Sequence, residues 1–158
     1  MCIRDRESTI QYIKDNDLDQ EEKEEVWVVF DFDINEDELP QIKQEFNAAI
    51  ELANKHNIKC ATSNDSFELW YILHFLFTDM AHRRDWYNKK LSEILKVKYS
   101  KDKKVSIQMY NRLKEHQKIA IRNAKKLEKI HKAKIPCDKN PYSSVYNLVE
   151  ALNEYIRD

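Results

Sequence analysis

The chain has 158 residues and a net charge of −1, a length that suits one domain with a hydrophobic core. It contains no glycine, which excludes the glycine-rich phosphate-binding loop and the dinucleotide-binding glycine motif and indicates many helices with few tight turns. No apolar stretch approaches the roughly 18 residues of a membrane span, and the first residues lack the apolar core of a secretory signal.

The cysteines bear on the compartment. Cys2, Cys60 and Cys137 are widely scattered and odd in number. This pattern argues against a disulfide framework or a zinc site and favours a reducing compartment. We therefore expect a cytoplasmic protein with no membrane partner.

The small net charge conceals two segments of opposite charge. Residues 1–57 carry 6 Lys or Arg and 16 Asp or Glu, a net charge of −10. Residues 96–134 carry 14 Lys or Arg and 3 Asp or Glu, a net charge of +11. One explanation is an acidic region beside a separate surface that binds a polyanion, and the other is that the two segments attract each other within the fold.

The first six residues have an unusual sequence for the start of a protein. Met-Cys-Ile-Arg-Asp-Arg at 1–6 resembles the translation of a sequencing adaptor at the end of an environmental gene fragment. We therefore expect genuine protein to begin near Glu7 and the true amino terminus to be missing. A short helix over 8–14 and an acidic, solvated connector over 15–25 are expected next.

The first predicted strand covers residues 26–33 and ends in two aspartates. Its apolar run is typical of a fully buried strand in a parallel sheet. Because side chains two apart face the same way, Asp31 and Asp33 can converge on one point while Phe32 turns into the packing. Carboxylates at this end of a strand lie where open α/β sheets bind ligands, and they suit Mg²⁺ or Mn²⁺. The alternative is that Asp31 ends the strand and Asp33 begins a turn.

A helix and a second strand follow. The helix is predicted over 38–55, because its apolar residues recur at spacings of 3 and 4 on one face and Pro40 suits the first turn. A buried strand is predicted over 58–62. Strand, helix and strand form a βαβ unit, so the two strands should be parallel and end at the same edge of the sheet.

At that edge the sequence predicts a buried helix with two unusual polar residues. Between residues 67 and 77 only Glu68 and His74 are strongly polar. Glu68 either completes a capping box with Asp65 or lies near the Asp31 and Asp33 edge, where it supplies a third carboxylate or orders a bound water. His74 is either a hydrogen-bonded core histidine or a functional imidazole, and it is expected to be buried in both cases.

Residues 78–104 are expected to form a helical insertion that ends in a basic linker, and a long helix is predicted over 106–132. Within the insertion, Trp86, Leu91, Ile94 and Leu95 are expected to pack on the core. The buried side of the long helix is predicted to comprise Met109, Leu113, Ala120, Ala124, Leu127 and Ile130.

The same long helix carries a stripe of basic residues at spacings of 4, 4, 3, 4 and 3. On a regular helix this stripe is about 27 Å long. Like charges in a row repel, so nucleic-acid phosphate is the natural partner. The alternative is a solvated face opposite the acidic amino-terminal half. The stripe comprises Lys114, Lys118, Arg122, Lys125, Lys129 and Lys132.

Residues 135–141 contain two prolines and are expected to break the helix. A last helix follows Ser144 and ends the chain. Its predicted apolar face comprises Val145, Leu148, Val149, Leu152 and Ile156.

Three segments together resemble the RloB-like family, known from abortive-infection loci. They are VWVVFDFD at 26–33, SNDSFELWYILHF at 63–75 and NPYSSVYNLVEAL at 140–152, and the intervening AIRNAKK at 120–126 is similar in style. The resemblance covers about residues 20–156, and its middle segment is the most distinctive.

The resemblance implies a Toprim-like α/β fold with a small, mostly parallel sheet flanked by helices. We expect a single domain over 1–158, with a partial α/β core at 7–77 and a helical part at 78–158 packed on it. The family's Asp-x-Asp motif corresponds to Asp31 and Asp33, which would hold Mg²⁺ (or Mn²⁺).

The implied function is a metal-dependent nuclease that acts on DNA or RNA in anti-phage defence, beside a partner ATPase of the same restriction-linked operon. The early Toprim strand that ends in glutamate and glycine has no counterpart here, and Asp65-Ser66 stands where Pro-Cys is expected. The alternative is a non-catalytic nucleic-acid-binding or ATPase-docking regulatory subunit.

Overall fold

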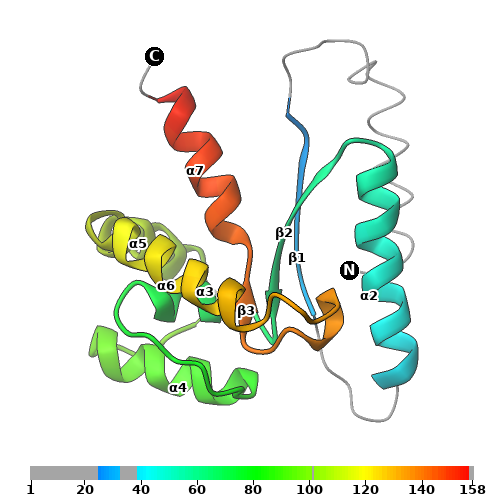
Figure 1. The fold of residues 1–158 in the computed structure, drawn as a ribbon. Helices are drawn as coiled ribbons and strands as arrows, with labels where there is room; N and C mark the ends of the chain where they lie inside the picture. Colours follow the sequence, from blue (N-terminus) through cyan, green and yellow to red (C-terminus); the bar gives the residue numbers. More distant parts are fainter. Residues whose placement is uncertain (1–24, 33–38, 101, 157–158) are drawn as a thin grey trace.

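The protein has a mixed α/β fold in which helices flank a three-stranded sheet of order β1-β2-β3 (Figure 1). A computed structural model describes residues 25–32, 39–100 and 102–156. Three predictions lie outside these ranges. They are the start of genuine protein near Glu7, the short helix at 8–14, and the site residue Asp33. The predicted fold class, a small and mostly parallel sheet with flanking helices, is confirmed. None of the helices in the described ranges is both long and apolar enough to cross a membrane.

The predicted βαβ unit is present. Strand β1 (Trp27–Asp31) pairs in parallel with β2 (Lys59–Asn64), and the register runs from Trp27 beside Lys59 to Asp31 beside Ser63. Helix α2 (Leu39–Lys55) connects the two strands. The carboxyl ends of β1 and β2 therefore meet at one edge of the sheet, as the sequence predicts.

Alternation along β1 positions Asp31. Phe30 and Phe32 face α2, where their rings pack edge-to-face on Phe46 at 5.4 and 4.9 Å. Because residues alternate, Asp31 points away from this aromatic cluster. The prediction that β1 is fully buried is wrong. Val29, on the face opposite α2, is 45% exposed, because β1 lies at the edge of the described sheet and α7 covers that face mainly over β2.

The helical part packs against the other face of the sheet. It contains α3 (Glu68–Leu73), α4 (Arg84–Leu95), α5 (Lys103–Leu113), α6 (Gln117–Ile130) and α7 (Val145–Tyr155). The buried helix expected near 67–77 is shorter than its apolar run, since α3 ends at Leu73 and Phe77 is 38% exposed. In the insertion, Leu91 and Leu95 are buried and Trp86 and Ile94 pack against the same core, as predicted.

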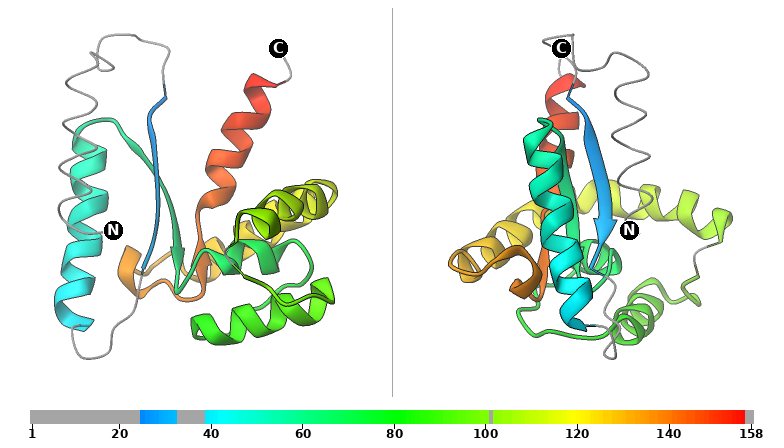
Figure 2. Two further views of the ribbon diagram at one scale, coloured as in Figure 1. Left: turned by 180° about the vertical axis from the view of Figure 1, so that it is seen from behind. Right: turned by 90° about the vertical axis from the view of Figure 1, so that its right-hand side faces the viewer.

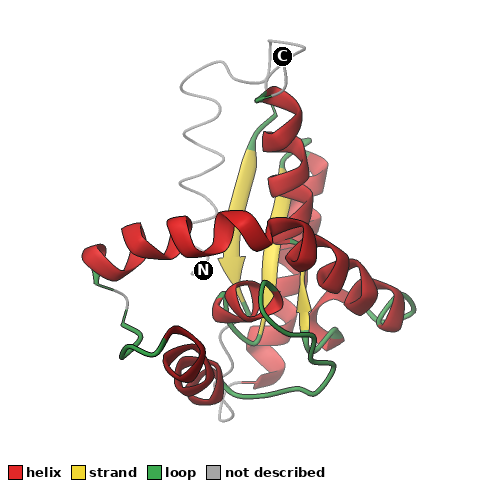
Figure 3. Cartoon of the chain, turned by 90° about the vertical axis from the view of Figure 1, so that its left-hand side faces the viewer, coloured by secondary structure: helices red, strands yellow, loops and turns green. Residues whose placement is uncertain are grey.

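The long helix predicted over 106–132 is interrupted. A 3-10 turn at Lys114–His116 separates α5 from α6, and the two run end to end as one bent rod (Figure 3). A 3-10 turn has three residues per turn instead of 3.6, so it rotates the faces of α6 relative to α5. The residues predicted for the buried side of this long helix are buried, with the exception of Ile130, which is 53% exposed at the end of α6.

Strand β3 (Tyr142–Ser143) pairs antiparallel with β2 and was not predicted, because two residues carry no periodicity. Helix α7 follows it and extends alongside the strands away from α5 and α6 (Figure 2). Val145 is buried, and Leu148 and Val149 pack against the core. Leu152 and Ile156 were predicted to share this apolar face, but they are 51% and 81% exposed, because the end of α7 projects beyond the core.

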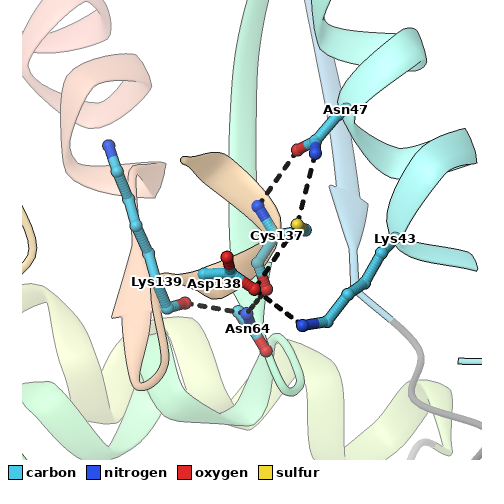
Figure 4. Close-up of polar contacts among 6 residues, drawn as sticks. All are labelled: Lys43, Asn47, Asn64, Cys137, Asp138 and Lys139. Atoms are coloured by element: carbon cyan, nitrogen blue, oxygen red, sulfur yellow. Dashed lines mark hydrogen bonds and ion pairs between the residues drawn. The ribbon is translucent and has the colours of Figure 1, made fainter. Parts of the chain in front are cut away.

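A polar cluster fixes the end of β2 (Figure 4). The Asn64 amide donates to the carbonyls of Cys137 and Lys139 at 3.3 and 2.7 Å. Asn47 of α2 accepts from the Cys137 backbone N–H at 3.1 Å, and Lys43 pairs with Asp138 at 2.7 Å. These contacts tie α2, β2 and the 136–138 turn together, and they hold the sheet edge in place.

Candidate functional site

Three acidic residues lie where β1 and β2 end and α3 begins, and we call Asp31, Asp65 and Glu68 the acidic edge. Asp31 closes β1, Asp65 follows β2, and Glu68 opens α3. Glu68 is 1% exposed and Asp65 is 4% exposed. The short connection between Ser63 and α3 returns the chain over the sheet edge, which explains how Glu68 is buried there.

Tyr99 interacts with two of these carboxylates. Its hydroxyl donates a hydrogen bond of 3.1 Å to Glu68 Oε1. Burial raises the pKa of Tyr99, and the negative charges of Glu68 and, less strongly, Asp31 raise it further. Asp31 and Glu68 therefore act on the same side chain, and the structure brings them to one region of the sheet edge.

Two adjacent arginines of the insertion balance the acidic edge. Arg84 Nη2 lies 3.3 Å from Asp31 Oδ2, and Arg83 Nε lies 3.8 Å from Asp65 Oδ2. Neither arginine was predicted as a site residue, and neither was Tyr99. The Arg-Arg pair at the start of α4 was the feature of the sequence that could have indicated these contacts. Because Arg84 follows Asp31 by 53 residues, the sequence did not show that the two meet.

Glu68 has a partner away from its own helix, beside the capping-box alternative. The residue that precedes α3 is Phe67, which makes no side-chain capping hydrogen bond. Asp65 pairs with Arg83. Glu68 Oε1 accepts from the Tyr99 hydroxyl, which gives this carboxylate a contact outside its own helix.

The donor set of the acidic edge suits a hard cation. Mg²⁺ commonly binds proteins through one or two carboxylates and keeps several waters. Asp31 and Glu68 offer two carboxylates with no thiolate beside them, and Asp33 lies outside the described residues. Within those ranges, no three His, Cys, Asp or Glu residues lie close enough together to hold a metal.

His74 is buried, as predicted, at 3% exposure. Its Nδ1–H donates to the Trp70 carbonyl at 2.8 Å, and its ring packs edge-to-face on the Trp70 indole at 4.8 Å. Burial lowers the pKa of His74, and the charge of His116 contributes in the same direction. These contacts fit the hydrogen-bonded core histidine better than a metal ligand.

The basic stripe is divided among three places. Lys118, Arg122, Lys125 and Lys129 line a cleft of about 870 Å³ between α6 and α7, which we call the basic cleft. Lys114 lies in the 3-10 turn and lines a neighbouring cleft, while Lys132 follows the end of α6 and lines neither. The turn at 114–116 and the end of α6 are why the stripe is shorter than predicted.

One member of the stripe already has an anionic partner. Lys125 pairs with Glu150 of α7 at 2.7 Å and lies 5.5 Å from the Tyr146 ring centroid. Lys118, Arg122 and Lys129 make no ion pair within the described residues. The acidic partner found here comes from α7 and not from the acidic segment at 1–57.

A family model described as RloB-like protein matches residues 2–152, nearly the whole chain. A search of curated proteins and a search of solved structures each gave no match.

Proposed function

Because this chain belongs to the RloB-like family, we propose that it is a Toprim-like, metal-dependent nuclease domain that acts in anti-phage defence. The observation that carries the proposal is the acidic edge. Asp31 and Glu68 come from a parallel strand end and from the following helix, and both act on Tyr99. Carboxylates at the carboxyl ends of parallel strands lie where α/β sheets bind ligands.

In this proposal Asp31 and Asp33 would hold Mg²⁺ (or Mn²⁺), and the bound ion would neutralise charge that develops on the scissile phosphate. Glu68 supplies a further carboxylate or orders a bound water, and Tyr99 keeps its orientation. Arg84, beside Asp31, is placed to contact a phosphate once a cation shares that carboxylate.

The basic cleft positions the substrate. Phosphate contacts fix a nucleic acid's register and orientation without reading its sequence. Lys118, Arg122 and Lys129 supply positive charges that no described acid neutralises. By the same family resemblance, the partner is an ATPase of the same operon, and the setting is the cytoplasm.

A second candidate is a non-catalytic nucleic-acid-binding or ATPase-docking subunit. It is favoured by the ion pair between Asp31 and Arg84, which gives the aspartate a structural partner. It also agrees with the lack of a three-residue metal cluster in the part of the chain that the structure describes.

A cleavage assay separates the two candidates. Labelled DNA and RNA are incubated with the protein in Mg²⁺, in Mn²⁺ and in EDTA. We expect metal-dependent cleavage that Asp31→Asn abolishes and that Asp79→Asn, a change at an exposed aspartate, leaves intact. Binding without cleavage in every metal would support the non-catalytic candidate instead.

A further inference from the structure

We propose that the protein takes its nucleic acid as a single strand, with phosphates in the basic cleft and an unpaired base in an adjoining aromatic cleft. This inference rests on the proposed function, because it names the substrate class of the same site. It requires an aromatic surface beside the basic one, and the structure contains such a surface.

The aromatic cleft has a volume of about 340 Å³ and lies between α3, α5 and α7. On one side the rings of α3 and of the residues that flank it pack edge-to-face in pairs, Phe67 with Tyr71 at 5.3 Å and Trp70 with His74 at 4.8 Å. On the other side Tyr110 of α5 is 70% exposed. Trp70 and His74 are buried, so the rings available to a ligand are exposed Tyr110 and partly exposed Phe67 and Tyr71, on which a flat base can stack.

The two clefts adjoin each other. Gln117, Asn153 and Ile156 line both of them, and the Asn153 amide donates to Gln117 Oε1 at 2.8 Å, so a strand that occupies both clefts passes over this contact. Lys114 lines the aromatic cleft and Lys118 lines the basic cleft. Positive side chains are therefore present on both sides of the boundary between the clefts. Glu150 and Glu154 also line the basic cleft, and Glu150 offsets Lys125.

This combination distinguishes a single strand from a duplex. A paired base exposes only its edges in the grooves, whereas an unpaired base can offer its face to an aromatic side chain. Proteins that bind single strands combine a positive groove for the backbone with aromatic platforms for the bases. A duplex would use the basic cleft and leave the aromatic cleft empty.

The aromatic cleft also adjoins the acidic edge. The ring centroid of Tyr71, which lines the cleft, lies 6.4 Å from that of Tyr99, and Tyr99 donates to Glu68. The negative charge of Glu68 raises the pKa of Tyr71, although burial is the larger cause. A base in the cleft would therefore hold the neighbouring strand beside the proposed metal-binding carboxylates.

The test measures binding in EDTA, so that it does not depend on cleavage. Fluorescence anisotropy follows labelled DNA and RNA strands of about 12 nucleotides, within the usual site sizes of single-strand binders, and the duplexes of the same sequences. The proteins are wild type, Tyr110→Ala, Tyr110→Phe, the double variant Lys118→Gln/Arg122→Gln, and Tyr155→Ala. Tyr155 is a matched control, because it is 62% exposed on α7 and lines neither cleft.

We expect wild type to bind single strands more tightly than duplexes. Loss of one stacking contact should weaken single-strand binding by about tenfold in Tyr110→Ala. Tyr110→Phe, which keeps the ring, and Tyr155→Ala should bind as wild type does, and duplex binding should not change in any of these three. Because Tyr110 is exposed, its replacement should leave the melting temperature unchanged.

The inference is overturned if Tyr110→Ala binds single strands as tightly as wild type, or if wild type prefers duplexes. If only the double variant loses affinity, the aromatic cleft has no such role while the proposed substrate surface stands. If neither the tyrosine nor the double variant changes binding, the basic cleft is not the substrate surface, and the proposed function loses its substrate surface as well.

Discussion

The Tyr99 hydroxyl donates a 3.1 Å hydrogen bond to Glu68 Oε1 and so joins the loop after α4 to the first residue of α3. The Tyr99 backbone N–H in turn donates to Ser92 Oγ at 3.0 Å, which anchors this loop to α4. A buried carboxylate is costly unless it is hydrogen-bonded, so this contact helps to explain how Glu68 is accommodated at 1% exposure.

Glu68→Gln and Tyr99→Phe should have different effects. The glutamine amide still accepts from Tyr99, so Glu68→Gln should fold with near-wild-type stability but lose metal-dependent activity. Tyr99→Phe removes a donor from a buried carboxylate and should cost about 1–3 kcal/mol of stability. Thermal or urea unfolding, beside the cleavage assay, measures both effects. Full activity in Glu68→Gln would show that this carboxylate has only a structural role.

His74 should make the protein less stable in mild acid. Its folded-state pKa is lowered, chiefly by burial, so the folded protein binds fewer protons than the unfolded chain. Its contribution is full above the unfolded pKa of about 6.5 and is lost as the pH falls toward the lower folded value. His74→Phe should flatten this dependence, whereas His74→Ala should destabilise at every pH because it opens a buried site.

Urea unfolding between pH 8 and pH 5 measures this dependence. His131 has a pKa lowered in the same direction, again mainly by burial, so some acid sensitivity should remain in the His74 variants. An identical pH profile for wild type and His74→Phe would show that His74 is not the source of the acid loss.

The basic cleft should produce salt-dependent binding. Log affinity should fall linearly with log salt, and each phosphate contact removed should flatten the slope by about 1. Replacing Lys118, Arg122 and Lys125 with Gln should therefore reduce the slope by about 3, or by about 2 if Lys125 stays with Glu150. The effect should be similar for many sequences, because backbone contacts read none.

The matched control for this triple variant is Lys89→Gln/Lys98→Gln, two exposed lysines that do not line the cleft. Lys90 is less suitable as a control, because it pairs with Glu93 at 3.1 Å. If the triple variant and wild type have the same slope, the stripe is a solvated face, as the alternative sequence interpretation holds.

Sequence periodicity predicted the part of the fold that depends on local patterns. The βαβ unit follows from two apolar runs and one amphipathic helix, and the parallel register then brings the end of β1 beside β2. The alternation around Phe32 correctly separated the packed side of β1 from the side that carries Asp31. These features follow from the periodicity of each element and from the parallel pairing that a βαβ unit imposes.

Features that depend on distant packing were missed or misjudged. The pairing of Arg84 with Asp31 and that of Tyr99 with Glu68 span 53 and 31 residues, and no periodicity reports such contacts. Ile130 and Ile156 continue apolar stripes correctly, but they lie where α6 and α7 extend past the core. A helical period shows which side of a helix is apolar, but it does not show how far along the helix other elements pack against that side.

The most direct test of the proposed metal site is a calorimetric titration of Mn²⁺ or Mg²⁺. The proteins are wild type, Asp31→Asn/Asp33→Asn, and the control Glu51→Gln/Asp79→Asn, which removes two exposed carboxylates elsewhere. If Asp31 and Asp33 share one divalent ion, wild type and the control bind it equally and the aspartate variant does not. Equal binding by the aspartate variant and wild type would contradict the proposed metal site.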